Sequence, residues 1–193
     1  MDLLLAAFPP ELGPLRDAPP RGWETACTGV GALTAAATTA RLIAERRPER
    51  VVFLGTCGRY DDRLGLFDCL WASEAIATSL EEVWGEAYRP EIERTRWAAS
   101  LAGPLPGHRV AVPPAITRTA KAARALAAVA PAEHLELTGV YAACAAAGVP
   151  FGGALVVVND VGPDAQVQWK ANHAEGSARL IEALRRLGFI EGA

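Results

Sequence analysis

Polar residues capable of chemistry follow three apolar runs of this sequence. Glu11 comes after the first run, Thr56 follows the second between two glycines, and the pair Asn159 and Asp160 follows the third. In open α/β sheets ligands bind outside the carboxyl ends of the strands, which is where these residues would lie. For each residue alone, a turn or a helix cap is the more ordinary explanation. Their coincidence after three predicted strands favours a binding or catalytic site.

Glu136 is a carboxylate at the head of an otherwise apolar helical segment, Leu137–Ala147. A buried acidic side chain is costly unless hydrogen-bond donors surround it. One explanation is favourable charge at a helix N-terminus, which is worth a few tenths to about 1 kcal/mol. The other is that the carboxylate accepts hydrogen bonds from two neighbouring hydroxyls of a sugar.

The segment Thr28-Gly29-Val30-Gly31 precedes a helical pattern and matches a dinucleotide-binding fingerprint only in part. Thr34 stands where the third glycine of that fingerprint belongs. The free backbone N–H groups of such a turn can bind a polar or anionic ligand. Tight packing of the helix on a strand accounts for the glycines equally well.

Short apolar runs alternate along the chain with helical patterns. Three continuous runs predict strands buried on both faces, at 3–8, 51–55 and 154–158, with weaker candidates at 24–28, 67–73 and 108–112. Helices are predicted over Ala32–Arg46, Leu137–Ala147 and 173–187, and residues 81–106 show no clear period. In the first helix the apolar spacing places these residues toward the core: Leu33, Ala36, Ala37, Ala40, Ile43 and Ala44. The alternation predicts an α/β protein, a three-layer sandwich with a central mixed, largely parallel sheet flanked by helices.

Length and composition narrow the class of partner. A chain of 193 residues is expected to form one domain spanning residues 1–193, and 51% hydrophobic with 21% charged residues is typical of a folded chain. The 19 basic and 22 acidic residues give a net charge of -3, so no broad cationic surface is available to nucleic acid or to an anionic membrane. A small-molecule ligand is therefore expected.

Cysteine and histidine usage argues against a metal centre. The three histidines are dispersed, and so are the four cysteines, which form no CxxC pair: Cys27, Cys57, Cys69 and Cys144. Neither a zinc site nor a disulfide framework is expected, and no cofactor is predicted. The apolar run at 3–8 has no preceding basic residue and ends at prolines, so we interpret it as a buried strand of a cytoplasmic protein.

Taken in order, these motifs resemble the nucleoside phosphorylase and nucleosidase superfamily. Its members include purine nucleoside phosphorylases, methylthioadenosine/adenosylhomocysteine nucleosidases and futalosine hydrolases. Leu135-Glu136 is similar to the family's Met-Glu motif, and residues 148–151 are similar to the GVPF that follows it. The other matching segments are 6–12, 28–31 and 55–58, so the resemblance covers most of the chain.

The resemblance implies a role for each candidate residue. Glu136 would bind the ribose hydroxyls, Glu11 would be the general base toward water, and Asn159 or Asp160 would contact the leaving base. Asn159 is favoured because residues 159–162, followed by Trp169-Lys170, are closer to futalosine-hydrolase-like members; Asp160 is the alternative. The remaining substrate-binding positions are Phe8, Thr56, Cys57, Gly58 and Leu135.

The family's members differ in their nucleophile. Its phosphorylases hold phosphate with an arginine just before the central glycine loop, where this sequence has Phe53. We therefore expect hydrolysis of a purine-type nucleoside, futalosine-like or methylthioadenosine-like, by a homodimer or higher homo-oligomer. The alternatives are a phosphorylase, with Arg16 or Arg59 rebuilding the anion site, and a nucleoside-binding protein without catalysis.

Overall fold

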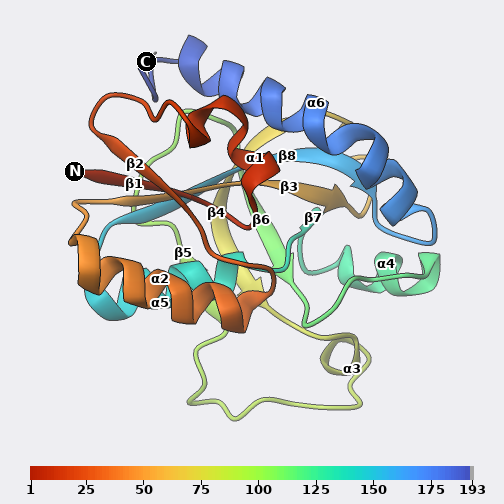
Figure 1. Ribbon diagram of the computed structural model, residues 1–193. Helices are drawn as coiled ribbons and strands as arrows, with labels where there is room; N and C mark the ends of the chain where they lie inside the picture. Colours follow the sequence, from red (N-terminus) through yellow and green to blue (C-terminus); the bar gives the residue numbers. More distant parts are fainter. Residues whose placement is uncertain (192–193) are drawn as a thin grey trace.

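The computed structural model describes residues 1–191 as one mixed sheet with helices on both faces (Figure 1). The strands are β1 (Asp2–Ala6), β2 (Trp23–Cys27), β3 (Val51–Arg59), β4 (Cys69–Ala77), β5 (Arg96–Ala98), β6 (Gly107–Val112), β7 (Ala132–Glu133) and β8 (Phe151–Asp160). The helices are α1 (Pro9–Leu12), α2 (Ala32–Arg46), α3 (Leu80–Val83), α4 (Ala120–Leu126), α5 (Leu137–Ala147) and α6 (Ala165–Arg186), with a 3₁₀ turn η1 (Gly13–Arg16) after α1. None of the helices in residues 1–191 is long and apolar enough to cross a bilayer.

The strand order is β2-β1-β3-β7-β6-β4-β5, and β8 pairs with both β3 and β4. The strands β3, β7, β6, β4 and β8 therefore close into a ring, from which β1, β2 and β5 extend. The pairs β1–β2, β1–β3, β3–β8, β4–β6 and β6–β7 are parallel, whereas β3–β7, β4–β5 and β4–β8 are antiparallel. The predicted mixed, largely parallel sheet is confirmed.

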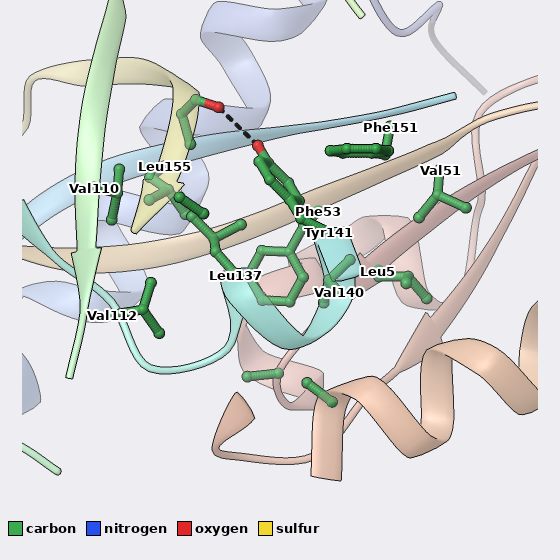
Figure 2. Close-up of a cluster of buried hydrophobic side chains, with 14 of the residues drawn as sticks. Leu5, Val51, Phe53, Val110, Val112, Leu137, Val140, Tyr141, Phe151 and Leu155 are labelled. Carbon is green, nitrogen blue, oxygen red and sulfur yellow. Dashed lines mark hydrogen bonds between the residues drawn. The ribbon is translucent and has the colours of Figure 1, made fainter. Parts of the chain in front are cut away.

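The sheet lies between two helical layers, so the predicted sandwich is also confirmed (Figure 1). The blue helix α6 covers one face, where Leu180, Ile181 and Leu184 pack against side chains of β1, β3 and β8. Helices α2 and α5 cover the other face, where Figure 2 shows Leu137, Val140 and Tyr141 of α5 among core side chains of the strands. In this second core the hydroxyl of Tyr141 donates to the carbonyl of Ala72, at 2.8 Å.

Helices α2 and α5 approach each other closely at Gly139, where an added Cβ would lie 1.9 Å from the carbonyl oxygen of Ala32. The predicted inner face of α2 is wrong in most positions. Leu33 is 87% exposed, and the buried residues of α2 are Ala35, Thr39, Leu42 and Ile43. An alanine-rich helix has a weak apolar asymmetry, so its spacing does not determine which side its neighbours cover.

The element boundaries differ from the predicted ones at the places that matter for the site. β3 continues to Arg59 and β8 to Asp160. Thr56, Asn159 and Asp160, which were expected just after the strands, are therefore residues of the strands themselves. Helix α6 begins at Ala165, well before the predicted start at residue 173, and α4 was not predicted. Residues 81–106 are largely irregular, as predicted, apart from α3 and the short β5.

Candidate active site

A cavity of about 360 Å³ opens at the carboxyl ends of β1, β3 and β8. These three strands run parallel in adjacent positions, so their ends meet at one edge of the sheet. Helix α6 contributes its first turns to the wall, and the segment from β7 to α5 contributes another side. The lining residues include all the candidates except Asp160: Phe8, Glu11, Thr56, Cys57, Gly58, Leu135, Glu136 and Asn159.

Glu11 is a buried carboxylate held by three donors. Its Oε1 accepts from the backbone N–H and the hydroxyl of Thr56, at 2.8 and 2.9 Å, and its Oε2 accepts from the N–H of Ala7 at 3.1 Å. Burial raises the pKa of Glu11 to about 7, with a smaller contribution from the negative charge of Glu136, while the donors oppose this rise. Glu11 can therefore exchange a proton near neutral pH.

Glu136 occupies the N-cap position of α5 and is buried. Its Oε1 accepts from the N–H of Gly31 at 2.8 Å, so the glycine-rich turn 28–31 binds a carboxylate of the protein itself. Gly29 and Gly31 have φ values of 82° and 89°, a left-handed conformation that favours glycine. The turn thus orients Glu136, a use of its N–H group that the sequence patterns did not indicate.

His134 borders the cavity beside Glu136 and was not singled out from the sequence. Its Nδ1 accepts from the backbone N–H of Glu136 at 3.1 Å, so this nitrogen carries no proton. Burial also lowers the pKa of His134. The distance of 3.3 Å from Nδ1 to Oε2 of Glu136 is therefore not an ion pair, and Oε2 keeps its capacity to accept from a ligand.

Glu133 is a third carboxylate of the lining that sequence reasoning missed. Its Oε2 accepts from the hydroxyl of Tyr60 at 2.7 Å, and its Oε1 accepts from the N–H of Thr117 at 3.1 Å. These bonds tie β7 to the end of β3 and to the loop that carries Ile116 into the cavity wall. The one available signal was a second acidic residue three positions before Glu136 in a run that is otherwise largely apolar.

Asn159 and Asp160 point to different places. Asn159 is buried, lines the cavity and donates its Nδ2 to the carbonyl of Asp160 at 2.9 Å. The side chain of Asp160 is 56% exposed and pairs with Arg59 at 2.6 Å, outside the cavity. Successive side chains of a strand alternate between its faces, so only one of the two can face the ligand. The geometry therefore favours Asn159 over Asp160, and which of the two contacts the base stays a prediction.

The position of Gly58 beside Asn159 leaves no room for a larger residue. A Cβ at Gly58 would lie 2.8 Å from Nδ2 of Asn159 and 2.7 Å from Cγ2 of Val161. The register between β3 and β8 shifts at this point, since Cys57 pairs with Val157 but Gly58 pairs with Asn159. Such bulges often lie next to active sites, where they reorient a side chain.

Phe53 does not border the cavity. It is fully buried in the core, where its ring contacts that of His134 edge-on at 5.2 Å between centroids. Arg59 is held by Asp160 and by the carbonyl of Leu64. Among the described residues the cavity lining contains three glutamates and neither lysine nor arginine, so its charge disfavours an anionic ligand.

Trp169 and Phe8 form an aromatic wall, with ring centroids 5.7 Å apart. The indole of Trp169 stacks on His173 at 4.4 Å and donates from Nε1 to the hydroxyl of Thr56 at 3.1 Å. Sequence reasoning did not place Trp169 in the site because it did not predict the first turns of α6. Within residues 1–191 no group of three or more His, Cys, Asp or Glu side chains is arranged to hold a metal ion.

The family model of the phosphorylase superfamily matches residues 25–187, and the chain belongs to this superfamily. No curated protein matches it in sequence. Solved structures share its fold over nearly the whole chain. One is a futalosine hydrolase mutant of Helicobacter pylori strain 26695, with a TM-score of 0.82, 16% identity, and coverage of 97% of this chain and 98% of that one.

Two further similar structures are 5'-methylthioadenosine/S-adenosylhomocysteine nucleosidases. The enzyme from Helicobacter pylori with butyl-thio-DADMe-Immucillin-A has a TM-score of 0.83 and 16% identity, and 97% of each chain is covered. The enzyme from Neisseria meningitidis with methylthio-immucillin-A has a TM-score of 0.81 and 14% identity, again with 97% of each chain covered. At this identity the likeness establishes the fold.

Proposed function

We propose that this protein hydrolyses the N-glycosidic bond of a purine-type nucleoside. The observation that carries the proposal is the lining of the cavity: Glu11, with a pKa near 7, shares it with Glu136 and Asn159, and no cation borders it among the described residues. Membership of the phosphorylase superfamily supports it, as do similar structures of nucleosidases that bind nucleoside analogues. The cytoplasmic location and the homo-oligomer stay predictions.

The three side chains divide the chemistry of bond cleavage. The bond between the anomeric carbon and the base nitrogen breaks, its electron pair leaves with the base, and the sugar acquires oxocarbenium character. Oε2 of Glu136 accepts from the sugar hydroxyls, and the amide of Asn159 donates to the departing base. The oxygen of water then bonds to the anomeric carbon while Glu11 takes the proton of that water.

Asn159 also bears on the choice of base. An amide donates hydrogen bonds but releases no proton, so it suits a base that leaves as a delocalised anion. A 6-oxopurine spreads that charge onto its exocyclic oxygen, whereas a 6-aminopurine has no such oxygen and depends more on protonation of the ring. We therefore infer a preference for 6-oxopurine nucleosides, as futalosine-like substrates would provide, over methylthioadenosine-like ones.

The phosphorylase alternative is disfavoured by the same lining. Three glutamates around the cavity repel a phosphate dianion. Of the two arginines proposed to rebuild the anion site, Arg59 is already paired with Asp160, and Arg16 does not line the cavity. A nucleophile that is neutral, such as water, meets no such repulsion.

The test is a panel of 6-oxopurine and 6-aminopurine nucleosides, incubated with and without inorganic phosphate. Free base and free ribose, or its 5′-modified form, should appear at a rate that phosphate does not change, and Glu11→Gln should abolish release. Ribose 1-phosphate as the main product would establish phosphorolysis instead. Binding of a nucleoside analogue without release from any nucleoside would establish a binding protein.

A further inference from the structure

Three side chains of the site form one hydrogen-bonded series that ends on the carboxylate. Nε1 of Trp169 lies 3.1 Å from Oγ1 of Thr56, and this Oγ1 lies 2.9 Å from Oε1 of Glu11. The backbone N–H of Thr56 donates to the same Oε1 at 2.8 Å. Thr56 thus joins helix α6 to the carboxylate that follows β1.

The direction of this series follows from the donor inventory of its members. An indole N–H can only donate, so Oγ1 of Thr56 must be the acceptor of the bond from Trp169. A hydroxyl has a single proton, and with the indole proton occupying one lone pair, that proton is directed to the carboxylate of Glu11. We propose that Trp169 is a positioning residue that orients the Thr56 hydroxyl toward Oε1 of Glu11 and so makes Oε2 the oxygen that receives the proton of water.

The choice between the two oxygens rests on counting acceptor sites. Each carboxylate oxygen offers about two lone-pair positions. Oε1 already receives the N–H and the O–H of Thr56, whereas Oε2 receives only the N–H of Ala7. The assignment of the proton to Oε2 depends on the proposed hydrolysis; the orientation of the hydroxyl does not.

Packing holds the indole in the position that this series requires. Its ring stacks on His173 with an interplanar angle of 14°, and Phe8 contacts it from another side. The residue lies in α6, a long helix packed on the sheet, so the donor is carried by a rigid element. A replacement by phenylalanine keeps an aromatic ring at this place and removes the N–H group.

Other titratable groups surround Glu11, and of these the charge of Glu136 raises its pKa. The groups in the cavity lining or facing its walls are Glu133, His134, Glu136, Cys57, Cys27 and His173. Trp169→Phe alters none of their charges. An upward shift of the Glu11 pKa in this variant therefore reports the lost donor, because weaker burial beside the smaller ring would lower the pKa instead.

The test is the titration of Glu11 by ¹³C NMR of the side-chain carboxyl carbons, with the Glu11 signal assigned by its absence in Glu11→Gln. Thr56→Val should move the midpoint upward by about 1 to 2 pH units, because the charged carboxylate loses a hydrogen bond. Trp169→Phe should move it upward by about half a unit, through the weakened bond from Thr56. The double variant should titrate like Thr56→Val alone, since Trp169 acts through that hydroxyl.

Two controls separate positioning from general disturbance. Thr56→Ser retains the hydroxyl and should titrate like the wild type, and Trp84→Phe makes the same replacement in a half-exposed tryptophan that does not line the cavity. An unmoved midpoint in Trp169→Phe, or additive shifts in the double variant, would overturn the proposal. If no nucleoside is cleaved but the carboxyl titrations follow this order, the proposed function fails while the positioning role of Trp169 stands.

Discussion

Replacing Glu136 by glutamine tests the sugar-binding role with little change to the fold. The amide oxygen of the new side chain can keep the bond from the N–H of Gly31, which is 2.8 Å long in the wild type. The amide nitrogen then takes the place of Oε2, 3.3 Å from Nδ1 of His134, whose lone pair already accepts the backbone N–H of residue 136, so the amide protons stay directed to the ligand. The variant therefore presents a donor where the wild type presents a charged acceptor.

The expected loss follows from the bonds that Oε2 makes to the sugar. A hydrogen bond to a charged group contributes about 1.5–3 kcal/mol, and each 1.36 kcal/mol is a factor of about ten in rate. Losing one such bond in the transition state, together with the negative charge beside the oxocarbenium-like sugar, predicts a loss in kcat/KM of about 10² or more.

The assay is base release measured with a nucleoside and with its 2′-deoxy analogue, for the wild type and for Glu136→Gln. The wild type should discriminate strongly between the two substrates, whereas the variant should discriminate weakly because the acceptor for that hydroxyl is gone. Thermal unfolding of the variant should match that of the wild type. A folded variant with near-normal kcat/KM, or with undiminished discrimination, would refute the role of Glu136.

Four further predictions concern the site and the core. Burial raises the pKa of Glu11 from 4.5 to about 7, so kcat/KM should rise with pH through about 7, and a rate independent of pH between 5 and 9 would contradict the base role. Because folding favours the protonated form, the stability that this carboxyl contributes is lost as pH rises from about 4.5 to 7, and the Tm of Glu11→Gln should increase relative to the wild type across that window. Asn159→Ala should lower kcat/KM more than Asp160→Asn, and the reverse ranking in steady-state assays would return the base contact to Asp160. Gly139→Ala should destabilise the protein by about 1–3 kcal/mol in urea unfolding, because the new Cβ meets the carbonyl of Ala32. On an exposed helix face the same change stabilises by up to about 1 kcal/mol.

The sequence by itself determined the elements and most of the residues that meet in the cavity. Helices α2 and α5 have the bounds that their sequence pattern predicts, because α2 lies between Gly31 and Pro48 and α5 ends at Gly148 before Pro150. Glu11, Thr56 and Asn159 were found because polar residues at the ends of apolar strands of an α/β sheet must gather at one edge. Glu136 was found because a carboxylate stands out in a buried apolar helix.

Residues whose role depends on contacts between distant segments escaped sequence reasoning. The local sequence does not distinguish three residues of the lining: Glu133, His134 and Trp169. Their roles follow from the hydrogen bonds that they form in the folded chain with Tyr60, Glu136 and Thr56. Phe53 stands in the sequence where the family's phosphorylases have an arginine, and only the structure shows that its ring lies in the core and not in the cavity lining. The exposed side of α2 was equally undetermined, because alanine is tolerated on either face.

Only the tertiary structure placed Asn159 in the cavity and Asp160 outside it, and only it set the protonation behaviour of Glu11. A shift of one position along β8 would exchange the side chain that faces the cavity for the one that faces away from it. The pairing of β3 with β8 shifts register at Gly58, next to these two residues, and the sequence does not indicate this shift. The pKa of Glu11 depends on how deeply the closed sheet and α6 bury it and on the donors of Thr56 and Ala7. Desolvation and hydrogen-bond direction are properties of packed neighbours, which come together only when segments far apart in the chain fold against one another.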